Sequence, residues 1–187
     1  MRTSDLLSVV GMTSTAFTAV LARGVLPFEK GSSGGWSKFG VEEALRLAMF
    51  MDLTAQGMSQ AQASKLLRDE FNALLDFLNA EPAPLPGSVL FGEARFVRLP
   101  KKQSVPLQEV TRVVCAIAGD IDQAILRAQR GLKGQWEVRG LMLISASDTM
   151  GRILPRFIDS GLATPEVHQW AAFMRAPGAK QSWRRGQ

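Results

Sequence analysis

Residues 4–13 read SDLLSVVGMT, and a second apolar run follows that ends at residues 23–27, RGVLP. In both runs the apolar side chains recur at the spacing of a helix face, and Gly11 separates the two. Glycine readily adopts the positive φ at which many helices end, and Pro27 cannot continue a helix. The stretch therefore predicts two short helices joined by a tight turn.

The second of these helices divides into an inward and an outward face. Thr13 precedes it and suits the N-cap position, as Thr3 or Ser4 does for the first helix. The apolar residues at helical spacing that we expect to face the core are Phe17, Val20 and Leu21. The small hydroxyl side chains on the outward face are Ser14, Thr15 and Thr18. Side chains of this size can approach a groove closely, so this face is a candidate binding surface.

A glycine- and serine-rich segment, residues 29–38, follows the two helices. Such a run does not sit in a helix and favours a turn between two short strands. Lys38 lies between Trp36 and Phe39 on the return strand, and a basic, aromatic base suits a phosphate backbone or a minor groove. The candidate contact residues of this hairpin are Lys30, Ser32, Ser33, Trp36 and Lys38.

Two further helices are expected after the hairpin. The first begins near residues 39–43 with an acidic turn, which suits the positive end of the helix dipole. Gly57 ends it, and Ser59 caps a shorter helix. Two helices at a glycine turn, a glycine-rich hairpin and then more helix are the layout of a winged helix-turn-helix. We therefore predict a nucleic-acid-binding domain over residues 1–80.

Residues 3–67 resemble the DNA-binding domain of the MerR family of transcription regulators. Four short motifs at matching spacing carry the resemblance: Gly11-Met12-Thr13 at the turn, Gly24-Val25-Leu26 at the helix exit, Gly35-Trp36-Ser37-Lys38-Phe39 at the end of the wing, and Gly57-Met58-Ser59 between the last two helices. The resemblance implies a homodimer that binds double-stranded DNA, with the second helix in the major groove and the wing on the backbone. From the outward face of the second helix and its end, the contacts that we predict are Ser14, Thr15, Thr18 and Arg23.

The same head has other uses. A related winged-helix head occurs in phage excisionases and in small terminase subunits, so a DNA-packaging or recombination accessory protein is one alternative. Another is an adaptor that docks on a protein, because the basic and tyrosine residues usual on the recognition helix of the family are here Thr15, Thr18, Ala19 and Val20. In that case the second half would bind RNA or an acidic partner.

The charge of the chain lies unevenly along the sequence. The net charge is +5, but residues 1–80 hold 7 Lys and Arg against 8 Asp and Glu, whereas residues 81–187 hold 15 against 9. A duplex binder gains much of its affinity by neutralising phosphates. A near-neutral head therefore counts against DNA binding unless the second half also neutralises phosphates. The arginines available there for a phosphate-facing patch are Arg95, Arg98, Arg112, Arg127, Arg130 and Arg139.

The second half is expected to be a separate α+β domain. Three prolines in residues 81–88 indicate a stiff linker. Residues 88–99 are expected to form one strand with a bulge or a tight hairpin, and residues 105–130 a helix. A central strand is expected at residues 136–145, and two helices follow it, the first capped by Ser147 or Asp148 and the last begun by Thr164-Pro165. Residues 89–187 would dimerise, sense a ligand or bind a partner, and they end in a basic tail. The fold class predicted for the chain is mainly α with a small β content.

Enzymatic, metal-binding and membrane roles are not indicated. Residues 31–35 match the G-x-S-x-G pattern of hydrolases, but they belong to a hairpin and not to a strand-to-helix elbow. His168 is the only histidine and has no nucleophile at a recognisable spacing. Cys115 is the only cysteine, which rules out an internal disulfide, and we expect it to be an inert thiol buried in a helix.

No apolar run reaches the roughly 20 residues that cross a bilayer, and residues 1–10 lack the long apolar core of a signal peptide. We therefore expect a cytoplasmic protein that binds neither a membrane nor a metal or other cofactor.

Overall fold

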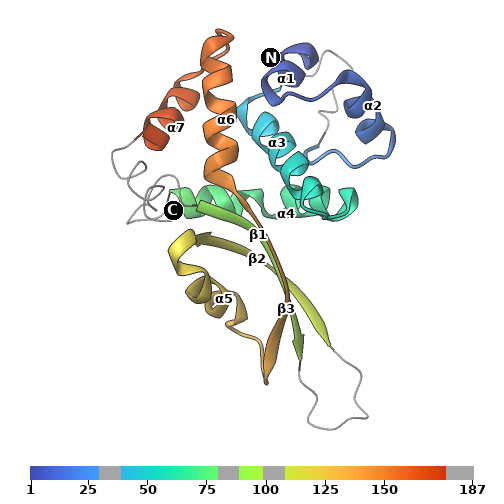
Figure 1. Ribbon diagram of the computed structural model, residues 1–187, viewed down its shortest axis with the longest axis vertical. Helices are drawn as coiled ribbons and strands as arrows, with labels where there is room; N and C mark the ends of the chain where they lie inside the picture. Colours follow the sequence, from blue (N-terminus) through green and yellow to red (C-terminus); the bar gives the residue numbers. More distant parts are fainter. Residues whose placement is uncertain (30–38, 80–88, 99–107, 176–187) are drawn as a thin grey trace.

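The computed structural model describes residues 1–29, 39–79, 89–98 and 108–175 (Figure 1). The first part holds four helices, α1 (Thr3–Val10), α2 (Ser14–Ala22), α3 (Val41–Ala55) and α4 (Gln60–Leu78). The second part consists of β1 (Val89–Arg98), β2 (Glu109–Ile117), the single 3₁₀ turn η1 (Ala118–Asp120), α5 (Ile121–Gln129), β3 (Trp136–Ser145), α6 (Ala146–Asp159) and α7 (Pro165–Arg175).

The three strands form one antiparallel sheet in the order β2-β1-β3, so β1 is the central strand. Figure 1 shows helices α1–α4, α6 and α7 gathered around one end of this sheet, with α5 beside the strands. A register shift in the β1–β3 pairing lies between Arg95 and Phe96. The fold class is mainly α with a small β content, as the sequence predicts.

The ends of the first helices follow from local sequence. Gly11 has φ 79° at the end of α1, and the Thr13 hydroxyl accepts a hydrogen bond from the Ala16 N–H at the start of α2. Ser59 caps α4 in the same way. The expected cap at Thr3 or Ser4 is wrong, because α1 begins at Thr3 and the Asp5 carboxylate instead accepts the Arg2 N–H.

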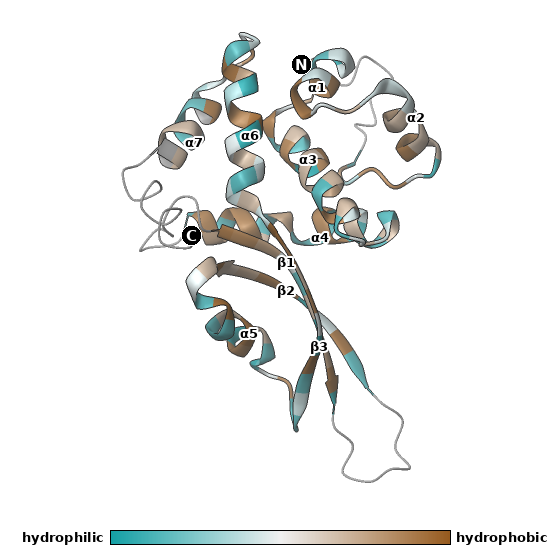
Figure 2. Cartoon of the chain, in the orientation of Figure 1, coloured by the Kyte–Doolittle hydropathy of each residue, from teal (hydrophilic) through white to brown (hydrophobic). Residues whose placement is uncertain are grey.

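Most of the apolar core lies between the helices. It contains the buried residues of α1 to α4 together with those of α6 and α7. Two β1 residues, Val89 and Phe91, and Ile144 of β3 extend this core onto one face of the sheet. Figure 2 shows the same continuity, because the apolar colour covers β1 and β2 where they approach the helices. One core therefore contains residues from both sides of the proline-containing segment at residues 81–88.

Polar contacts reinforce this joint between α6 and the first helices. The Asp52 carboxylate on α3 accepts hydrogen bonds from the buried Thr149 hydroxyl and from the Arg152 guanidinium, whose Nη2 lies 2.8 Å from Oδ2. Arg156 donates through Nη1 to the Val9 carbonyl of α1 at 3.0 Å. These bonds connect residues about a hundred or more positions apart in the chain, so α6 is an integral part of the helical layer.

The opposite face of the sheet has a smaller core of its own. Its buried members are Ala94, Phe96, Val114, Ala116 and Ala124, the last on α5. Alternate residues of β1 therefore serve different cores, since Phe91 faces the helical layer and Phe96 faces α5. Gly92 between them allows close approach, because a Cβ at this position would overlap the Met142 carbonyl oxygen of β3.

The helix expected at residues 105–130 is wrong for its first part. Residues 109–117 form β2, paired with β1 from Val97↔Glu109 to Val89↔Ile117, and only Ile121–Gln129 are helical. The run VTRVVCAI is rich in β-branched side chains, which favour a pleated surface over a helix. Cys115 therefore lies on a strand and not in a helix.

The remaining sequence predictions have different outcomes. The strands at residues 89–98 and 136–145 are confirmed, as is the Thr164 cap of α7, whose hydroxyl accepts the Val167 N–H. Two expectations are wrong: the cap of α6 is Ser145 and not Ser147 or Asp148, and β3 is an edge strand, since β1 occupies the centre of the sheet. The wing at residues 30–38, the linker at residues 81–88 and the basic tail at residues 180–187 lie outside the described residues.

Candidate nucleic-acid interface

Helices α1 and α2 meet at a sharp angle through a short turn. Residues 11–13 connect them, and the pair is bent by 109°. Helix-turn-helix pairs typically cross at roughly 90–120° through a three- or four-residue turn that often contains glycine. Here Gly11 supplies the left-handed residue, and its N–H and that of Met12 both donate to the Leu7 carbonyl. The turn is therefore closed by hydrogen bonds and fixes the direction of α2.

Helix α2 presents the expected hydroxyl residues to solvent. Ser14, Thr15 and Thr18 are exposed, whereas Phe17 and Val20 are buried against the other helices. The expectation that Leu21 faces inward is wrong, because 38% of this residue is exposed. The physical reason is the position of α2 at the edge of the helical layer (Figure 1), where its buried face is only as wide as Phe17 and Val20.

Arg23 lies immediately after α2 and is also exposed. Its guanidinium Nη1 donates to the Gln60 side-chain oxygen at 2.9 Å, which links the end of α2 to the start of α4. The side chain is thus held at the C-terminal end of the α2 face. The structure places Ser14, Thr15, Thr18 and Arg23 on one helix and its end, as the sequence predicted for a binding surface.

The remaining predicted contacts, Lys30, Ser32, Ser33, Trp36 and Lys38, lie outside the described residues. The two ends of that segment are nonetheless fixed in place. Phe39 exchanges two backbone hydrogen bonds of 3.0 Å with Met1, just before α1. Phe28 packs edge-on against the Phe39 ring, with centroids 5.8 Å apart. Phe28 and Phe39, on the two sides of that segment, therefore lie side by side near the start of α1.

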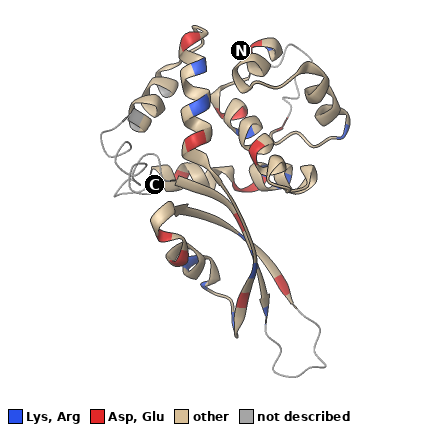
Figure 3. Ribbon diagram, viewed as in Figure 1, with Lys and Arg blue, Asp and Glu red and all other residues tan. Residues whose placement is uncertain are grey.

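The candidate face carries almost no charge. Helix α2 contains no charged residue, and Figure 3 shows it in the neutral colour along its length. The six arginines that the sequence offers for a phosphate-facing patch are exposed and lie on the strands, on α5 or just after it: Arg95, Arg98, Arg112, Arg127, Arg130 and Arg139. Arg98 donates to the Gln108 side chain and Arg139 pairs with Glu137 at 3.1 Å. Acidic residues are interspersed, so these arginines do not form a patch of one sign.

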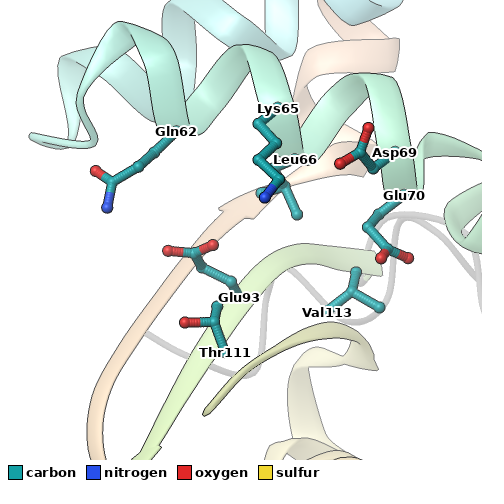
Figure 4. Close-up of a pocket in the computed structure, with 8 residues that line it drawn as sticks. All are labelled: Gln62, Lys65, Leu66, Asp69, Glu70, Glu93, Thr111 and Val113. Carbon is teal, nitrogen blue, oxygen red and sulfur yellow. The ribbon is translucent and has the colours of Figure 1, made fainter. Parts of the chain in front are cut away.

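A cleft lies between α4 and the sheet, away from the α2 face (Figure 4). This cleft has a volume of about 410 Å³, and its polar lining comes from Gln62, Lys65, Asp69, Glu70, Glu93 and Thr111. Figure 4 shows Lys65 and Glu93 reaching into the cleft from opposite walls. Within the described part of the chain, no three His, Cys, Asp or Glu side chains are placed to hold a metal ion.

Burial shifts the pKa of two groups beside this cleft. Loss of water contact raises the pKa of the Glu93 carboxyl on β1. Burial, and to a lesser degree the charge of Glu70, raises the pKa of the Cys115 thiol to about 12. Cys115 is therefore protonated at neutral pH, which makes it a poor nucleophile.

Comparisons with known proteins identify no relative. No protein-family model matches the chain, and no curated protein matches it. No single helix in the described ranges is long and apolar enough to cross a membrane.

Proposed function

We propose that this protein is a sequence-specific DNA-binding regulator of MerR-like type. The observation that carries the proposal is the 109° bend from α1 to α2 through the Gly11 turn, which leaves a face of small hydroxyl residues exposed on α2. Such a helix fits the major groove, about 12 Å wide, while the preceding helix crosses the backbone. The sequence-predicted wing at residues 30–38 would add contacts to this helix face, and Phe39 after it is hydrogen-bonded to Met1 just before α1.

Each proposed contact has a definite role. The hydroxyls of Ser14, Thr15 and Thr18 bond phosphates or base edges. Arg23 supplies positive charge at the end of α2, where its bond to Gln60 keeps the guanidinium in place. Lys30 and Lys38 provide the charge of the wing, whose other contacts are Ser32, Ser33 and Trp36.

Few charged contacts imply a shallow dependence on salt. The logarithm of the binding constant falls with the logarithm of the salt concentration by about 0.9 for each phosphate neutralised. Because α2 has no charge of its own, Arg23, Lys30 and Lys38 are the only cations among the proposed contacts of the head. We therefore expect a slope of about 3 for each protomer.

We also propose a homodimer, formed along the outer edge of β3, which is an edge strand among the described residues. This strand exposes 37% of Val138 and 42% of Leu141. Its edge also carries two exposed charges of opposite sign, Glu137 and Arg139, and Arg139 is the extra residue at the register shift with β1. Two antiparallel copies can place Glu137 opposite the partner's Arg139 and Arg139 opposite the partner's Glu137, whereas an arrangement that opposes two identical charges is unfavourable.

Charge reversal tests the dimer. Arg139→Glu should weaken association at least about tenfold, since both cross-strand pairs become repulsive. The double variant Glu137→Arg/Arg139→Glu should restore it, because the pairs are exchanged and not removed. Sedimentation equilibrium of the full chain measures the association of both variants. If the single and the double variant weaken dimer association equally, the dimer does not form along the β3 edge.

Selection of the full chain on a random duplex library at two salt concentrations tests DNA binding. A two-part enriched site is expected, with Arg23→Ala weakening binding and reducing the salt slope by about 1. Arg127→Ala on α5 is the matched control, since this arginine is equally exposed but lies on the far side of the sheet from the head. An unaffected Arg23→Ala together with a weakened Arg127→Ala would show that α2 is not the reader.

An adaptor function is the alternative, and the uncharged α2 face with exposed Leu21 favours it. An adaptor would show no enriched duplex sequence, and its binding to nucleic acid would depend on the arginines of the second half alone.

A further inference from the structure

We infer that α2 recognises the methyl groups of thymine bases, and that Leu21 is a residue that determines specificity. The inference rests on the proposed function and adds the kind of sequence that the head would select. Leu21 was expected in the core from helical spacing, but it lies at the surface. Leu21 is the largest exposed apolar side chain of α2.

Five of the six exposed residues of α2 form one continuous stripe. At about 100° per residue they fall within an arc of about 120°, in the angular order Leu21, Ser14, Thr18, Ala22 and Thr15. The sixth, Ala16, and the buried Phe17 and Val20 lie outside this arc. A helix rises about 1.5 Å per residue, so the stripe extends over about 12 Å. It is therefore long enough to contact three or four consecutive base pairs.

The chemistry of this stripe restricts which bases it can distinguish. Bidentate recognition of guanine needs Arg or Lys, and that of adenine needs Asn or Gln. Helix α2 contains none of these residues, nor any Asp or Glu that could accept from cytosine. Hydroxyls bond to several base edges without strong preference. Apolar contact with the C5-methyl group of thymine is the discriminating interaction that threonine methyls, Ala22 and Leu21 can make.

The placement of Leu21 fits this role. It lies two residues before Arg23, whose guanidinium is held at the end of α2 by Gln60. A phosphate contact by Arg23 would fix the register of the helix on the duplex, while Leu21, about 200° around the helix from Arg23, would face the groove together with Ser14 and Thr18. Leu21 is exposed in the free protein and would be removed from water in the groove. Burial of its apolar surface against a thymine methyl group would favour binding.

Replacing thymine by deoxyuridine tests the inference directly. This change removes only the C5-methyl group and leaves every hydrogen-bonding edge intact. In the enriched duplex, substitution at the contacted positions should weaken binding about three- to fivefold per methyl group. Leu21→Ala should bind the thymine duplex more weakly and lose the difference between thymine and uracil at one or two positions. Thr18→Ser, which removes a methyl and keeps the hydroxyl, should do the same at another position.

The matched control is Leu126→Ala. Leu126 is 54% exposed on α5, far from the head, and its removal should leave the thymine preference unchanged. Because Leu21 is partly exposed, its variant is expected to fold, and circular dichroism confirms this before binding is measured. An enriched duplex that binds equally well with uracil would overturn the inference while the proposed function stands. A preference retained by both Leu21→Ala and Thr18→Ser would overturn it as well. Absence of any enriched sequence would reject the proposed function and this inference together.

Discussion

The two faces of the sheet differ in what stabilises them. On one face, Phe91 joins a core that also contains residues of six helices, reinforced by the bonds of Asp52 and Arg156 to distant parts of the chain. On the other face, Phe96 lies among three alanines and Val114, beneath the single helix α5. The core under α5 thus has few buried members, and α5 follows β2 directly after one 3₁₀ turn. The comparison teaches that one strand can contribute to a large core on one face and to a small core on the other.

The strongest test of this difference removes the two phenylalanines in turn. Phe91→Ala should lower the free energy of unfolding by about 3–5 kcal/mol, because the tightly packed helical core cannot close the cavity. The loss in free energy of unfolding for Phe96→Ala should lie at or below the low end of that range, since α5 can move toward the sheet and partly fill the cavity. Urea unfolding measures both, and hydrogen exchange should show faster exchange in α5 alone for Phe96→Ala. Equal acceleration in α2 would contradict the division.

A change at Gly92 tests the strand that the two cores share. Gly92→Ala should destabilise the fold by about 1–3 kcal/mol or more, because its Cβ would meet the Met142 backbone and force β1 and β3 apart. Gly140→Ala is the control, since its nearest neighbour, the Arg95 Cβ, would be an ordinary 3.8 Å away. Thermal unfolding of both variants gives the comparison, and similar melting temperatures would refute the close approach.

The joint between the halves is tested at α3 and α6. Asp52→Ala should cost about 1–3 kcal/mol, because the buried Thr149 and the Arg152 guanidinium both lose a charged acceptor. Arg152→Ala should cost under about 1 kcal/mol, as its side chain is 44% exposed. Denaturant unfolding followed at both halves should remain a single transition for the wild type. Two separate transitions in the wild type would show that the halves unfold independently.

The smallest effect is expected at the boundary between α4 and the sheet. Burial raises the folded-state pKa of Glu93, so its contribution to stability is present at acid pH and is lost as the pH rises through that raised value. Glu93→Gln should therefore be more stable than the wild type at neutral pH, by about 0.5 kcal/mol or less. The gain should vanish at low pH. Glu109→Gln, on an exposed part of β2, should show no such crossover in a series of melting temperatures.

Sequence reasoning succeeded where short-range rules decide the structure. Gly11, Thr13 and Ser59 set helix ends through local hydrogen bonds, and the outward positions of Ser14, Thr15 and Thr18 follow from helical spacing. It failed for β2, because Val110, Val114 and Ile117 also recur at helical spacing, and only pairing with β1 decides between the two structures. Leu21 was misplaced for a similar reason: the width of a buried face depends on how many neighbours surround the helix, which spacing alone does not encode.

The junction of β3 and α6 has a mechanical consequence. Ser145 is both the last residue of the strand and the cap of the helix, so the chain passes from sheet to helix without a loop. Helix α6 in turn holds α1 through the Arg156–Val9 bond and α3 through Asp52. The direction of β3 therefore fixes where α6 starts, with no loop between them to change it. In the proposed dimer along β3, this junction would set the distance between the two α2 helices, and so the half-site spacing expected for the proposed DNA binding.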